Sequence, residues 1–378
     1  MKRLLFLISN GSFFLSHRLQ LALDARQAGY EVAIACPTGE SAARFAALGL
    51  RHLPIVMQRK GSTALSEIRT IVSVHRAIGQ FNPDLIHLIT AKPIIYGGAI
   101  ARIRGIPTVS AVSGLGHVFV AQAPRIRLLR ALVVAGYKVA LNHPRSHAIF
   151  QNTSDLATFR SLGIVTRGQH SLIPGSGADL DLIRPQPLPD GDTVLILPAR
   201  LIFNKGVQEF VDVARMMKAR GVRAVFRLVG NPDPGNPTSV PEATLRTWMA
   251  NGDIEWVPYT PDIGAELARA HIVVLPSHGG EGIPKTLIDA AAAGRAGAAS
   301  DVPGCRDAIA PGLTGVLFAA KDAADMARVL EPLIRDRNLQ AAMGQAARAR
   351  AEAMFDLRDV SATHQRIYAA QLPPRRQS

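Results

Sequence analysis

Short apolar runs alternate with helical patterns along this chain, and the alternation stops once and then starts again. In the first half we expect helices such as 16–28 and 65–81 between strands at 4–8, 31–35, 52–56, 85–89, 107–111, 147–150 and 170–173. After a proline-rich stretch at 183–192, strands recur at 194–197, 224–229, 254–257, 272–275, 297–300 and 315–318. This alternation predicts parallel sheets with right-handed crossovers. The fold class is therefore α/β, with two Rossmann-like, doubly wound domains facing each other across a cleft.

Length and composition fit this two-domain interpretation. With 378 residues, 48% of them hydrophobic, the chain is long enough to bury two cores. The composition excludes a disordered, collagen-like or disulfide-scaffold protein. We expect an N-terminal domain at 1–180, a C-terminal domain at 181–355, and a helix at 356–378 that returns to the N-terminal domain. The two cysteines, Cys36 and Cys305, have no metal-ligand spacing, which favours a reducing compartment.

Positive charge is concentrated in the first half of the chain. The formal net charge is +14, and residues 1–180 hold 20 basic against 7 acidic side chains. This points to a polyanionic partner, either an anionic membrane or nucleic acid, although an arginine-rich proteome would also raise the charge. Nucleic acid is the less favoured partner, because aromatic residues make up only 5% and no nucleic-acid-binding motif occurs.

A glycine-rich segment, 276–294, follows one expected strand and leads into an alanine-rich helix. Its glycines leave the backbone bare, and a helix that begins near Pro284 adds a positive end, so the segment can bind a diphosphate. Glu281 precedes the helix and Asp289 lies inside it, which would place a sugar near Glu281 and a ribose near Asp289. A tight turn without a ligand is the alternative interpretation.

Arg200 and Lys205 form a second candidate group, where the first strand of the C-terminal domain passes into its first helix. Strand ends deliver ligand contacts in such sheets. Two cations there can neutralise a leaving diphosphate without a metal ion. A solvated pair of basic side chains is the plainer alternative.

Together the two segments resemble the retaining nucleotide-sugar glycosyltransferases of family 4, which have the GT-B fold. Glu281 and Asp289 match that family's Glu-x7-Glu motif, with Asp in place of the second Glu. Arg200 and Lys205 match its diphosphate-binding pair. The resemblance spans nearly the whole chain, since further matching segments lie at 150–155, 175–179 and 302–307.

This resemblance implies a role for each matching residue. Glu281 would bind hydroxyls of the donor sugar and Asp289 the ribose, while Arg200 and Lys205 would stabilise the leaving diphosphate. Further contacts near the diphosphate would come from Asn10, Gly11, Gly280, Gly282, Ile283 and Pro284. The resemblance also implies retention of anomeric configuration by front-face attack, with the leaving phosphate taking the acceptor's proton. Neither a metal ion nor another cofactor is expected.

A narrower resemblance in the first half is carried by the segments 16–19, 90–93 and 112–119. They are similar to the subgroup that acts on polyprenyl-diphosphate-linked sugars, which builds surface polysaccharide or glycan precursors at the inner face of the bacterial membrane. Lys92, Ser113 and Gly114 would then lie on the acceptor side, and His117 would take part in catalysis. For Lys92 and His117 a purely structural role is the alternative.

Membrane association is also suggested by the segment 124–138, which is basic at its start and apolar behind. Such a segment can lie in the interface of an anionic leaflet, although packing of its apolar face on the sheet is an equal alternative. No stretch reaches the roughly 18 apolar residues of a membrane span. The run 4–8 is too short for a signal peptide, so we expect a cytoplasmic protein bound peripherally to the inner face of the plasma membrane.

The expected function is transfer of a hexose or N-acetylhexosamine from a UDP-linked donor to a polyprenyl-diphosphate-linked saccharide. Two departures from the family pattern bear on it: the shorter Asp289, and the Ala-Gly-Ala-Ala of 296–299 where the family has proline and β-branched residues. They leave a non-catalytic, membrane-associated scaffold of a polysaccharide assembly complex as one alternative. A nucleotide-sugar epimerase of the same fold is another.

Overall fold

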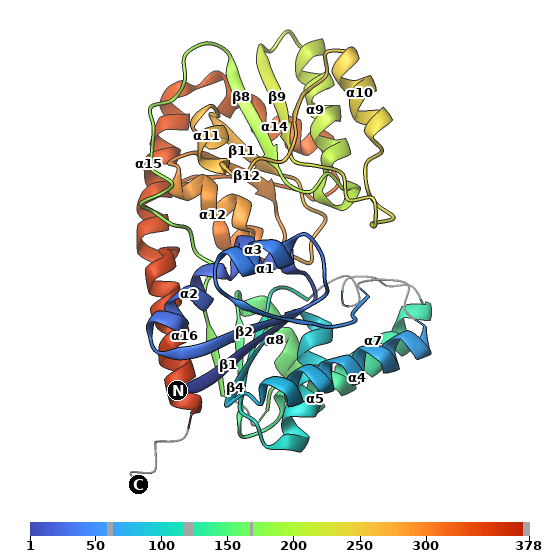
Figure 1. Ribbon diagram of the computed structural model, residues 1–378. Coiled ribbons are helices and arrows are strands. Elements are labelled where there is room, and N and C mark those ends of the chain that lie inside the picture. The colour runs from blue at the N-terminus through green and yellow to red at the C-terminus, as the bar shows by residue number, and fades with distance from the viewer. Residues whose placement is uncertain (59–62, 116–118, 120–123, 167–168, 373–378) are drawn as a thin grey trace. The chain divides into compact units, whose positions relative to one another are not determined.

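The computed structural model describes residues 1–58, 63–115, 119, 124–166 and 169–372, without the side chains of 124–126. The chain divides into two compact units (Figure 1). Unit 1 comprises Met1–Ser176 together with the chain from Asp359 onward, and unit 2 comprises Gly177–Arg358. Each unit holds one parallel sheet between two helical layers, which confirms the expected α/β class with two Rossmann-like domains. No helix within the described ranges is long and apolar enough to cross a membrane.

The sheet of unit 1 has seven strands in the order β3-β2-β1-β4-β5-β6-β7, and its pairings are parallel. The strands are β1 Lys2–Ile8, β2 Tyr30–Cys36, β3 Arg51–Pro54, β4 Leu85–Ile89, β5 Thr108–Val112, β6 Ser146–Phe150 and β7 Gln169–Leu172. The strand order reverses between β1 and β4, the switch point beyond which ligands bind in such sheets.

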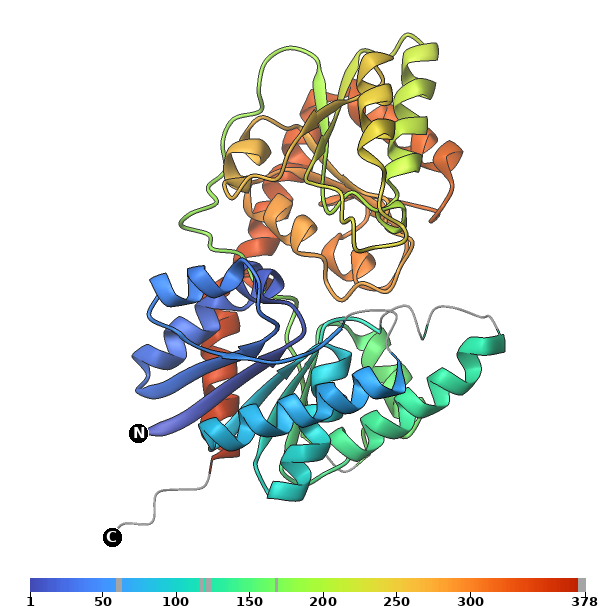
Figure 2. The same cartoon turned by 45° about the vertical axis from the view of Figure 1, so that its right-hand side comes forward.

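Helices cover both faces of this sheet (Figure 2). Those of unit 1 are α1 Gly11–His17, α2 Leu19–Gln27, α3 Ser41–Ala47, α4 Ala64–Phe81, α5 Ala91–Arg104, α7 Pro124–Leu141, α8 Thr153–Ser161 and α16 Leu357–Gln371. Along β1, Leu5 and Leu7 face the core shared with α4, α5, α7 and α8, whereas Phe6 faces the core shared with α1, α2, α3 and α16. Burial on both faces explains why β1 is a continuous apolar run.

The single helix expected at 16–28 is instead two helices. α1 begins after Asn10, whose side-chain oxygen accepts a hydrogen bond from the Phe13 amide at 2.9 Å. Arg18 stands at the junction of α1 and α2 and is only 3% exposed, so its guanidinium lies in the interior of unit 1. An apolar pattern that continues across Arg18 cannot reveal this break, because apolar residues of both helices pack in the same core.

Unit 2 has a six-stranded parallel sheet in the order β10-β9-β8-β11-β12-β13. Its strands are β8 Thr193–Pro198, β9 Ala224–Val229, β10 Glu255–Val257, β11 Ile272–Leu275, β12 Ala296–Ser300 and β13 Gly315–Phe318. Its α-helices are α9 Val207–Ala219, α10 Glu242–Ala250, α11 Ile263–Ala268, α12 Lys285–Ala292, α13 Cys305–Ala308, α14 Ala323–Arg335 and α15 Arg337–Met354. The helices α9, α10 and α14 line one face, α11, α12 and α13 line the other, and α15 contributes to both cores.

The small residues of 296–299 form the buried strand β12, which pairs with β11 and β13. The residues next to β12 leave little room for larger side chains. A Cβ on Gly315 would lie 2.0 Å from the Gly297 carbonyl oxygen, and a Cβ on Gly297 would lie 3.1 Å from Ile309. The departure from β-branched residues is therefore accommodated by close packing of the strand rather than by loss of the strand.

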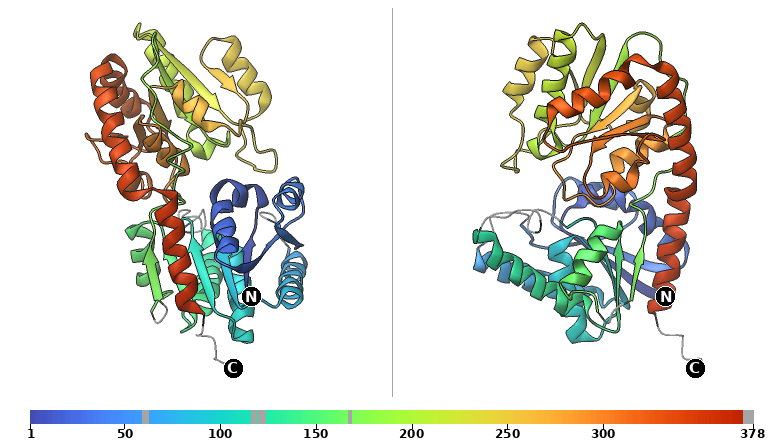
Figure 3. Two further views of the ribbon diagram at one scale, coloured as in Figure 1. Left: turned by 60° about the vertical axis from the view of Figure 1, so that its left-hand side comes forward. Right: turned by 180° about the vertical axis from the view of Figure 1, so that it is seen from behind.

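The chain crosses between the units twice, and the crossing segments are hydrogen-bonded to each other. The Ala178 amide donates to the Phe355 carbonyl at 2.8 Å, and the Leu357 amide donates to the Ala178 carbonyl at 3.0 Å. Beyond this point α16 (the last helix in Figure 3) buries Val360, Ile367 and Tyr368 in the core of unit 1.

A group of buried basic side chains, Arg18, His87 and His364, lies in this same core region. His87 Nδ1 shares a hydrogen bond of 2.5 Å with the Tyr368 hydroxyl, and its ring stacks on that of His364 at 5.6 Å between centroids. Burial, followed by the charges of His364 and Arg18, lowers the pKa of His87 well below its usual value. Burial and then Arg18 lower the pKa of His364 to about 3. Both histidines are therefore neutral in the folded chain near neutral pH.

Unit 1 should lose stability on acidification. Folded His364 stays neutral until its pKa of about 3, whereas an unfolded histidine binds a proton near 6.5. Below about pH 6.5 the unfolded chain binds more protons, so the free energy of unfolding falls by up to about 1.4 kcal/mol per pH unit for this group. Denaturant unfolding between about pH 7.5 and pH 5 should show a shallower decline in His364→Leu than in the wild type. An equal decline in both proteins would contradict this account.

Candidate active site at the carboxyl ends of the unit 2 strands

The donor-site residues expected from the sequence gather at one end of the unit 2 sheet. Arg200 and Lys205 follow β8, and Glu281 follows β11. These two strands are parallel neighbours, with Ile272 opposite Leu195, so their carboxyl ends reach the same edge. This edge is where open α/β sheets bind ligands.

Main-chain contacts hold the loops after β8 and β11 against each other. The His278 amide donates to the Asn204 carbonyl at 3.0 Å. Gly206, with φ of +74°, lies so close to Pro276 that a Cβ would be 2.0 Å from the Pro276 carbonyl oxygen. Glycine is needed here for the positive φ and for the close approach. The backbone therefore sets the position of Lys205, which directly precedes this glycine.

Lys205 and Glu281 form an ion pair at the centre of this edge. Lys205 Nζ donates to Glu281 Oε1, and the Ser277 hydroxyl donates to the same oxygen at 2.9 Å. Burial would raise the pKa of Glu281, but it is outweighed by the charge and hydrogen bond of Lys205, the Ser277 bond and the charge of Arg200, so the pKa is lowered. Glu281 is thus a carboxylate at neutral pH and can accept hydrogen bonds from sugar hydroxyls.

Arg200 is held by a different carboxylate. Its Nη1 lies 2.7 Å from Asp233 Oδ2, and 51% of the Arg200 side chain is exposed, against 19% for Lys205. Asp233 follows β9, so three neighbouring strands contribute charged groups to this edge. The expected pair of cations is present, but Lys205 is the more enclosed of the two.

The glycine segment after β11 bends sharply before α12. Gly279 and Gly280 have φ values of +109° and +79°. The segment 302–307 packs against it, since a Cβ on Gly304 would lie 1.6 Å from the Gly282 carbonyl oxygen. Glycine at these positions gives a compact turn that larger residues would distort. The turn can present backbone to a ligand at the positive end of α12.

Around the start of α12, Ile283 and Pro284 are buried and Lys285 opens the helix. Lys285 Nζ lies 2.5 Å from Asp289 Oδ1, one turn along, and Asp289 is 5% exposed. Burial raises the pKa of Asp289 and outweighs the opposing effect of Lys285. A ribose hydroxyl bound at Asp289 would therefore share this carboxylate with Lys285.

Sequence reasoning missed several partners of these residues. The spacing of four between Lys285 and Asp289 could have revealed their pairing. Nothing in the sequence links His278 to Glu209, although His278 Nε2 lies 2.7 Å from Glu209 Oε1. The residues not anticipated are Glu209, Asp233, Ser277, His278 and Lys285.

In unit 1, Asn10 and Gly11 lie just beyond the carboxyl end of β1. The Asn10 side chain caps α1. Gly11 packs tightly on α3, because a Cβ there would lie 2.0 Å from Ser41 Oγ. Both residues therefore stabilise the structure at this strand end: Asn10 caps α1, and Gly11 lets the backbone of α1 lie close to α3.

The residues expected on the acceptor side follow β4 and β5. Lys92, in the first turn of α5, lies 2.6 Å from Glu67 Oε1 and donates to the Gln58 carbonyl at 2.9 Å. Ser113 and Gly114 directly follow β5, and Gly114 has φ of +107°. His117 lies outside the described residues. Among the residues that are described, no three histidine, cysteine or acidic side chains form a group able to hold a metal ion.

Comparison with known families agrees with this architecture. Residues 180–350 match the model for glycosyl transferases group 1, and residues 3–153 match the model for glycosyl transferase 4-like domains. The chain is a GT-B glycosyltransferase. The expected resemblance is therefore confirmed as far as a GT-B glycosyltransferase.

Three similar proteins illustrate the relationship of this glycosyltransferase to others. It is 25% identical over 352 residues to the N,N'-diacetylbacillosaminyl-diphospho-undecaprenol alpha-1,3-N-acetylgalactosaminyltransferase of Campylobacter jejuni, covering 89% of this chain and 91% of the relative. The sucrose-phosphate synthase structure from Thermosynechococcus elongatus has a TM-score of 0.80 at 17% identity, covering 98% and 99%. Anabaena HepE in complex with UDP and glucose has a TM-score of 0.79 at 16% identity, covering 98% and 100%.

Gly206→Ala should destabilise this glycosyltransferase far more than Gly221→Ala. Both glycines have positive φ, but a Cβ on Gly221 meets nothing within 4 Å, whereas one on Gly206 would clash with the Pro276 backbone. Gly221→Ala should cost about 1 kcal/mol of unfolding free energy, from the positive φ alone. Gly206→Ala should cost at least about 2 kcal/mol more, as measured by urea unfolding. Equal losses of unfolding free energy in the two variants would show that the loops after β8 and β11 can separate freely.

Proposed function

We propose that this glycosyltransferase moves a sugar, with retention of anomeric configuration, from a UDP-linked donor to a polyprenyl-diphosphate-linked saccharide in polysaccharide assembly. The observation that carries the proposal is the enclosed Lys205–Glu281 pair beside the glycine segment and the start of α12. One relative is named for a diphospho-undecaprenol-linked acceptor, and one structural neighbour contains UDP. Both support this choice of acceptor and donor.

In the donor site, Lys205 would bind diphosphate oxygens and Glu281 the sugar hydroxyls. Because they contact each other, a bound nucleotide sugar would lie across the ion pair, with its diphosphate on the Lys205 side. Arg200, more exposed, would add a second positive charge as the diphosphate leaves. Backbone at Gly280, Gly282, Ile283 and Pro284 would approach the same group, and Asp289 would bind the ribose.

On the acceptor side, Lys92, Ser113 and Gly114 would bind the incoming saccharide, and Asn10 and Gly11 would approach the diphosphate from unit 1. His117 completes the proposed catalytic group. The acceptor hydroxyl would attack the face from which the diphosphate leaves, and a leaving-phosphate oxygen would take its proton. This route needs no metal ion. A lipid-linked acceptor would also bring the protein to the anionic inner surface of the plasma membrane, rather than to nucleic acid.

The first test is nucleotide binding. UDP at about 100 times its Kd should raise the melting temperature by roughly 5 °C, whereas GDP, ADP and CMP should have little effect. Lys205→Ala should remove most of the UDP shift, because it removes the enclosed cation. Lys218→Ala is the matched control, since Lys218 is an exposed lysine on α9 whose Nζ bonds the Asn251 carbonyl.

No shift with any nucleotide in folded protein would overturn the donor proposal. It would favour the non-catalytic scaffold, to which the shorter Asp289 and its bond to Lys285 already lend some support. An equal loss in Lys205→Ala and Lys218→Ala would show that the response does not come from this edge of the sheet.

Glu281→Gln should lower transfer by about 100-fold while changing UDP affinity only a few-fold, because a neutral amide binds developing positive charge at the sugar poorly. Product NMR should show the same anomeric configuration as the donor, and EDTA should leave kcat unchanged. An inverted product would contradict retention, and inhibition by EDTA would contradict metal independence. Epimerised nucleotide sugar formed without acceptor would point to an epimerase instead.

A further inference from the structure

Two helices of unit 1 carry aliphatic side chains on their outward faces. On α7 these side chains recur one turn apart, and Leu128 and Leu132 are 72% and 63% exposed. On α4, Ile68 is 56% exposed. The full set, named here the α4/α7 face, is Leu65, Ile68, Ile71, Val72, Leu128, Leu129, Leu132 and Val139. Single exposed leucines are ordinary, but a grouping of this kind marks an interaction surface.

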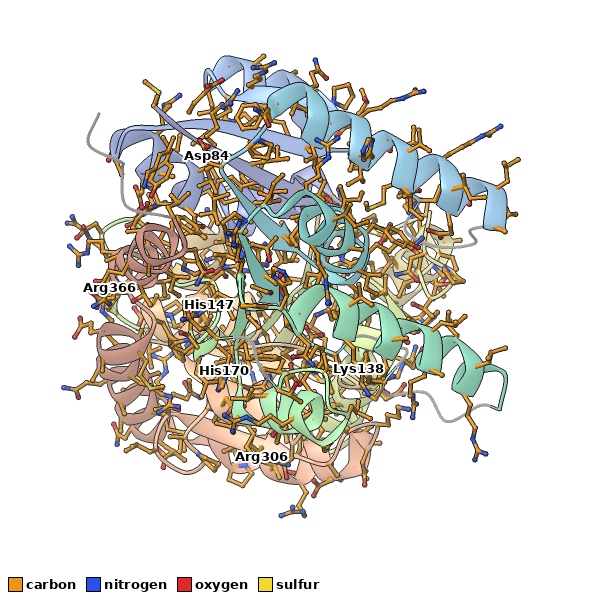
Figure 4. The ribbon with its side chains drawn as sticks, turned by 90° about the horizontal axis from the view of Figure 1, so that it is seen from below. Asp84, Lys138, His147, His170, Arg306 and Arg366 are labelled. Carbon is orange, nitrogen blue, oxygen red and sulfur yellow. The ribbon has the colours of Figure 1, made fainter. Side chains whose placement is uncertain are left out.

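The two exposed stripes belong to one surface because α5 lies between α4 and α7, packed against both (Figure 4). The packing of α5 is close. A Cβ on Gly97 would lie 2.5 Å from the Leu88 side chain, and a Cβ on Gly98 would lie 2.6 Å from Ala140 of α7. The glycine pair therefore lets α5 pack closely against the sheet and α7, between the exposed stripes of α4 and α7.

Charge around the α4/α7 face is of one sign. Its exposed basic residues are Arg69, Arg76, Arg102, Arg104, Arg127 and Lys138. The sequences of α5 and α7 contain no aspartate or glutamate. The single acidic residue of α4, Glu67, is bound by Lys92 and by the Tyr96 hydroxyl, which donates to Glu67 Oε2 at 2.6 Å. The face is thus apolar with a basic rim and has no free acidic partner among the described side chains of these helices.

The face also has a defined place in unit 1. Helices that cross over between parallel strands begin at the carboxyl ends of the strands. Most of the exposed aliphatic residues lie in the first half of α4 or near the start of α7, and so at the same end as Lys92 and Ser113. The Glu67–Lys92 pair connects α4 to the first turn of α5 directly. The apolar surface and the acceptor-side residues therefore share one end of the sheet.

We propose that the α4/α7 face docks on the surface of an anionic lipid bilayer, with its aliphatic side chains among the acyl chains and its basic rim against the phosphate headgroups. This inference rests on the proposed function, since it explains how a lipid-linked acceptor reaches Lys92. The charge pattern argues for lipid over a second copy of the chain, because a symmetric contact would bring basic rims together. Aliphatic insertion combined with basic attraction is the way interfacial helices bind such membranes.

The test is co-sedimentation of the full chain with vesicles that contain neither acceptor nor nucleotide. Binding should be strong with phosphatidylglycerol–phosphatidylcholine vesicles and much weaker with phosphatidylcholine alone. The double variant Ile68→Gln/Leu132→Gln should bind the anionic vesicles about tenfold more weakly. Arg69→Gln/Arg127→Gln should weaken binding and reduce its dependence on salt.

A matched control comes from unit 2, where Leu182 and Leu313 are 79% and 62% exposed but lie outside the face. Leu182→Gln/Leu313→Gln should bind vesicles like the wild type. Equal weakening in both double variants would overturn the assignment of the face. The assignment would also be overturned if the wild-type chain did not bind anionic vesicles. It would be overturned as well if the wild type self-associated and only Ile68→Gln/Leu132→Gln lost that self-association.

UDP binding separates this inference from the proposed function. The face variants should keep the UDP-induced thermal shift, and they should keep transfer to an acceptor dissolved in detergent. If the wild type transfers sugar to the dissolved acceptor but does not bind anionic vesicles, the docking face alone is overturned. Vesicle binding without any nucleotide binding would overturn the transferase proposal and leave the face standing.

Discussion

The parallel pairing of β8 with β11 is the constraint on which the candidate active site depends. It brings the Lys205 loop and the Glu281 loop to one place, and main-chain contacts then fix them, as with the Asn204 carbonyl and the His278 amide. The Thr286 hydroxyl, which donates to the Pro198 carbonyl at 2.8 Å, ties α12 to the end of β8. The Lys205–Glu281 ion pair is largely enclosed, so the cost of removing its two charges from water offsets much of their attraction. Its role is to hold two charges where the backbone has already placed them.

The two units share an architecture but differ in their outer surfaces. The helices of unit 2 carry mixed charges joined in ion pairs one turn apart, such as Arg246 with Glu242 and Arg335 with Glu331. Such surfaces face water without preference for a particular partner. The α4, α5 and α7 layer of unit 1 instead combines aliphatic side chains with unbalanced positive charge. The excess of charge seen in the first half of the sequence is therefore placed where it can act on one surface.

Much of this fold could be predicted from the sequence, because strands buried on both faces are continuous apolar runs and their alternation with helices indicates parallel sheets. The positions of Lys205 and Glu281, each just after a strand, could also be predicted from the sequence. Their mutual contact could not, because it depends on which strands are neighbours. The Glu67–Lys92 pair joins residues 25 apart and has no local signal.

The exposed apolar side of α4 could not be predicted from the sequence pattern either. Apolar residues at 65, 68 and 72 follow the spacing of a helix face that packs on a core. The buried stripe of α4 is instead formed by Thr70, Val74, Ala77, Ile78 and Phe81. A helix with apolar residues on two sides does not reveal from its spacing which side meets the sheet.

The double crossing between the units makes unit 2 an insertion within unit 1. Residues 1–176 leave the ribosome before unit 2, but α16, the helix that completes their second core, follows unit 2 in the chain. Unit 2 is continuous in sequence and can fold as soon as it is complete. Unit 1, although synthesised first, must wait with Arg18 and His87 uncovered by α16. The core that contains Arg18 and His87 can therefore be completed only after unit 2 has been synthesised, and a change in α16 affects the domain that precedes unit 2.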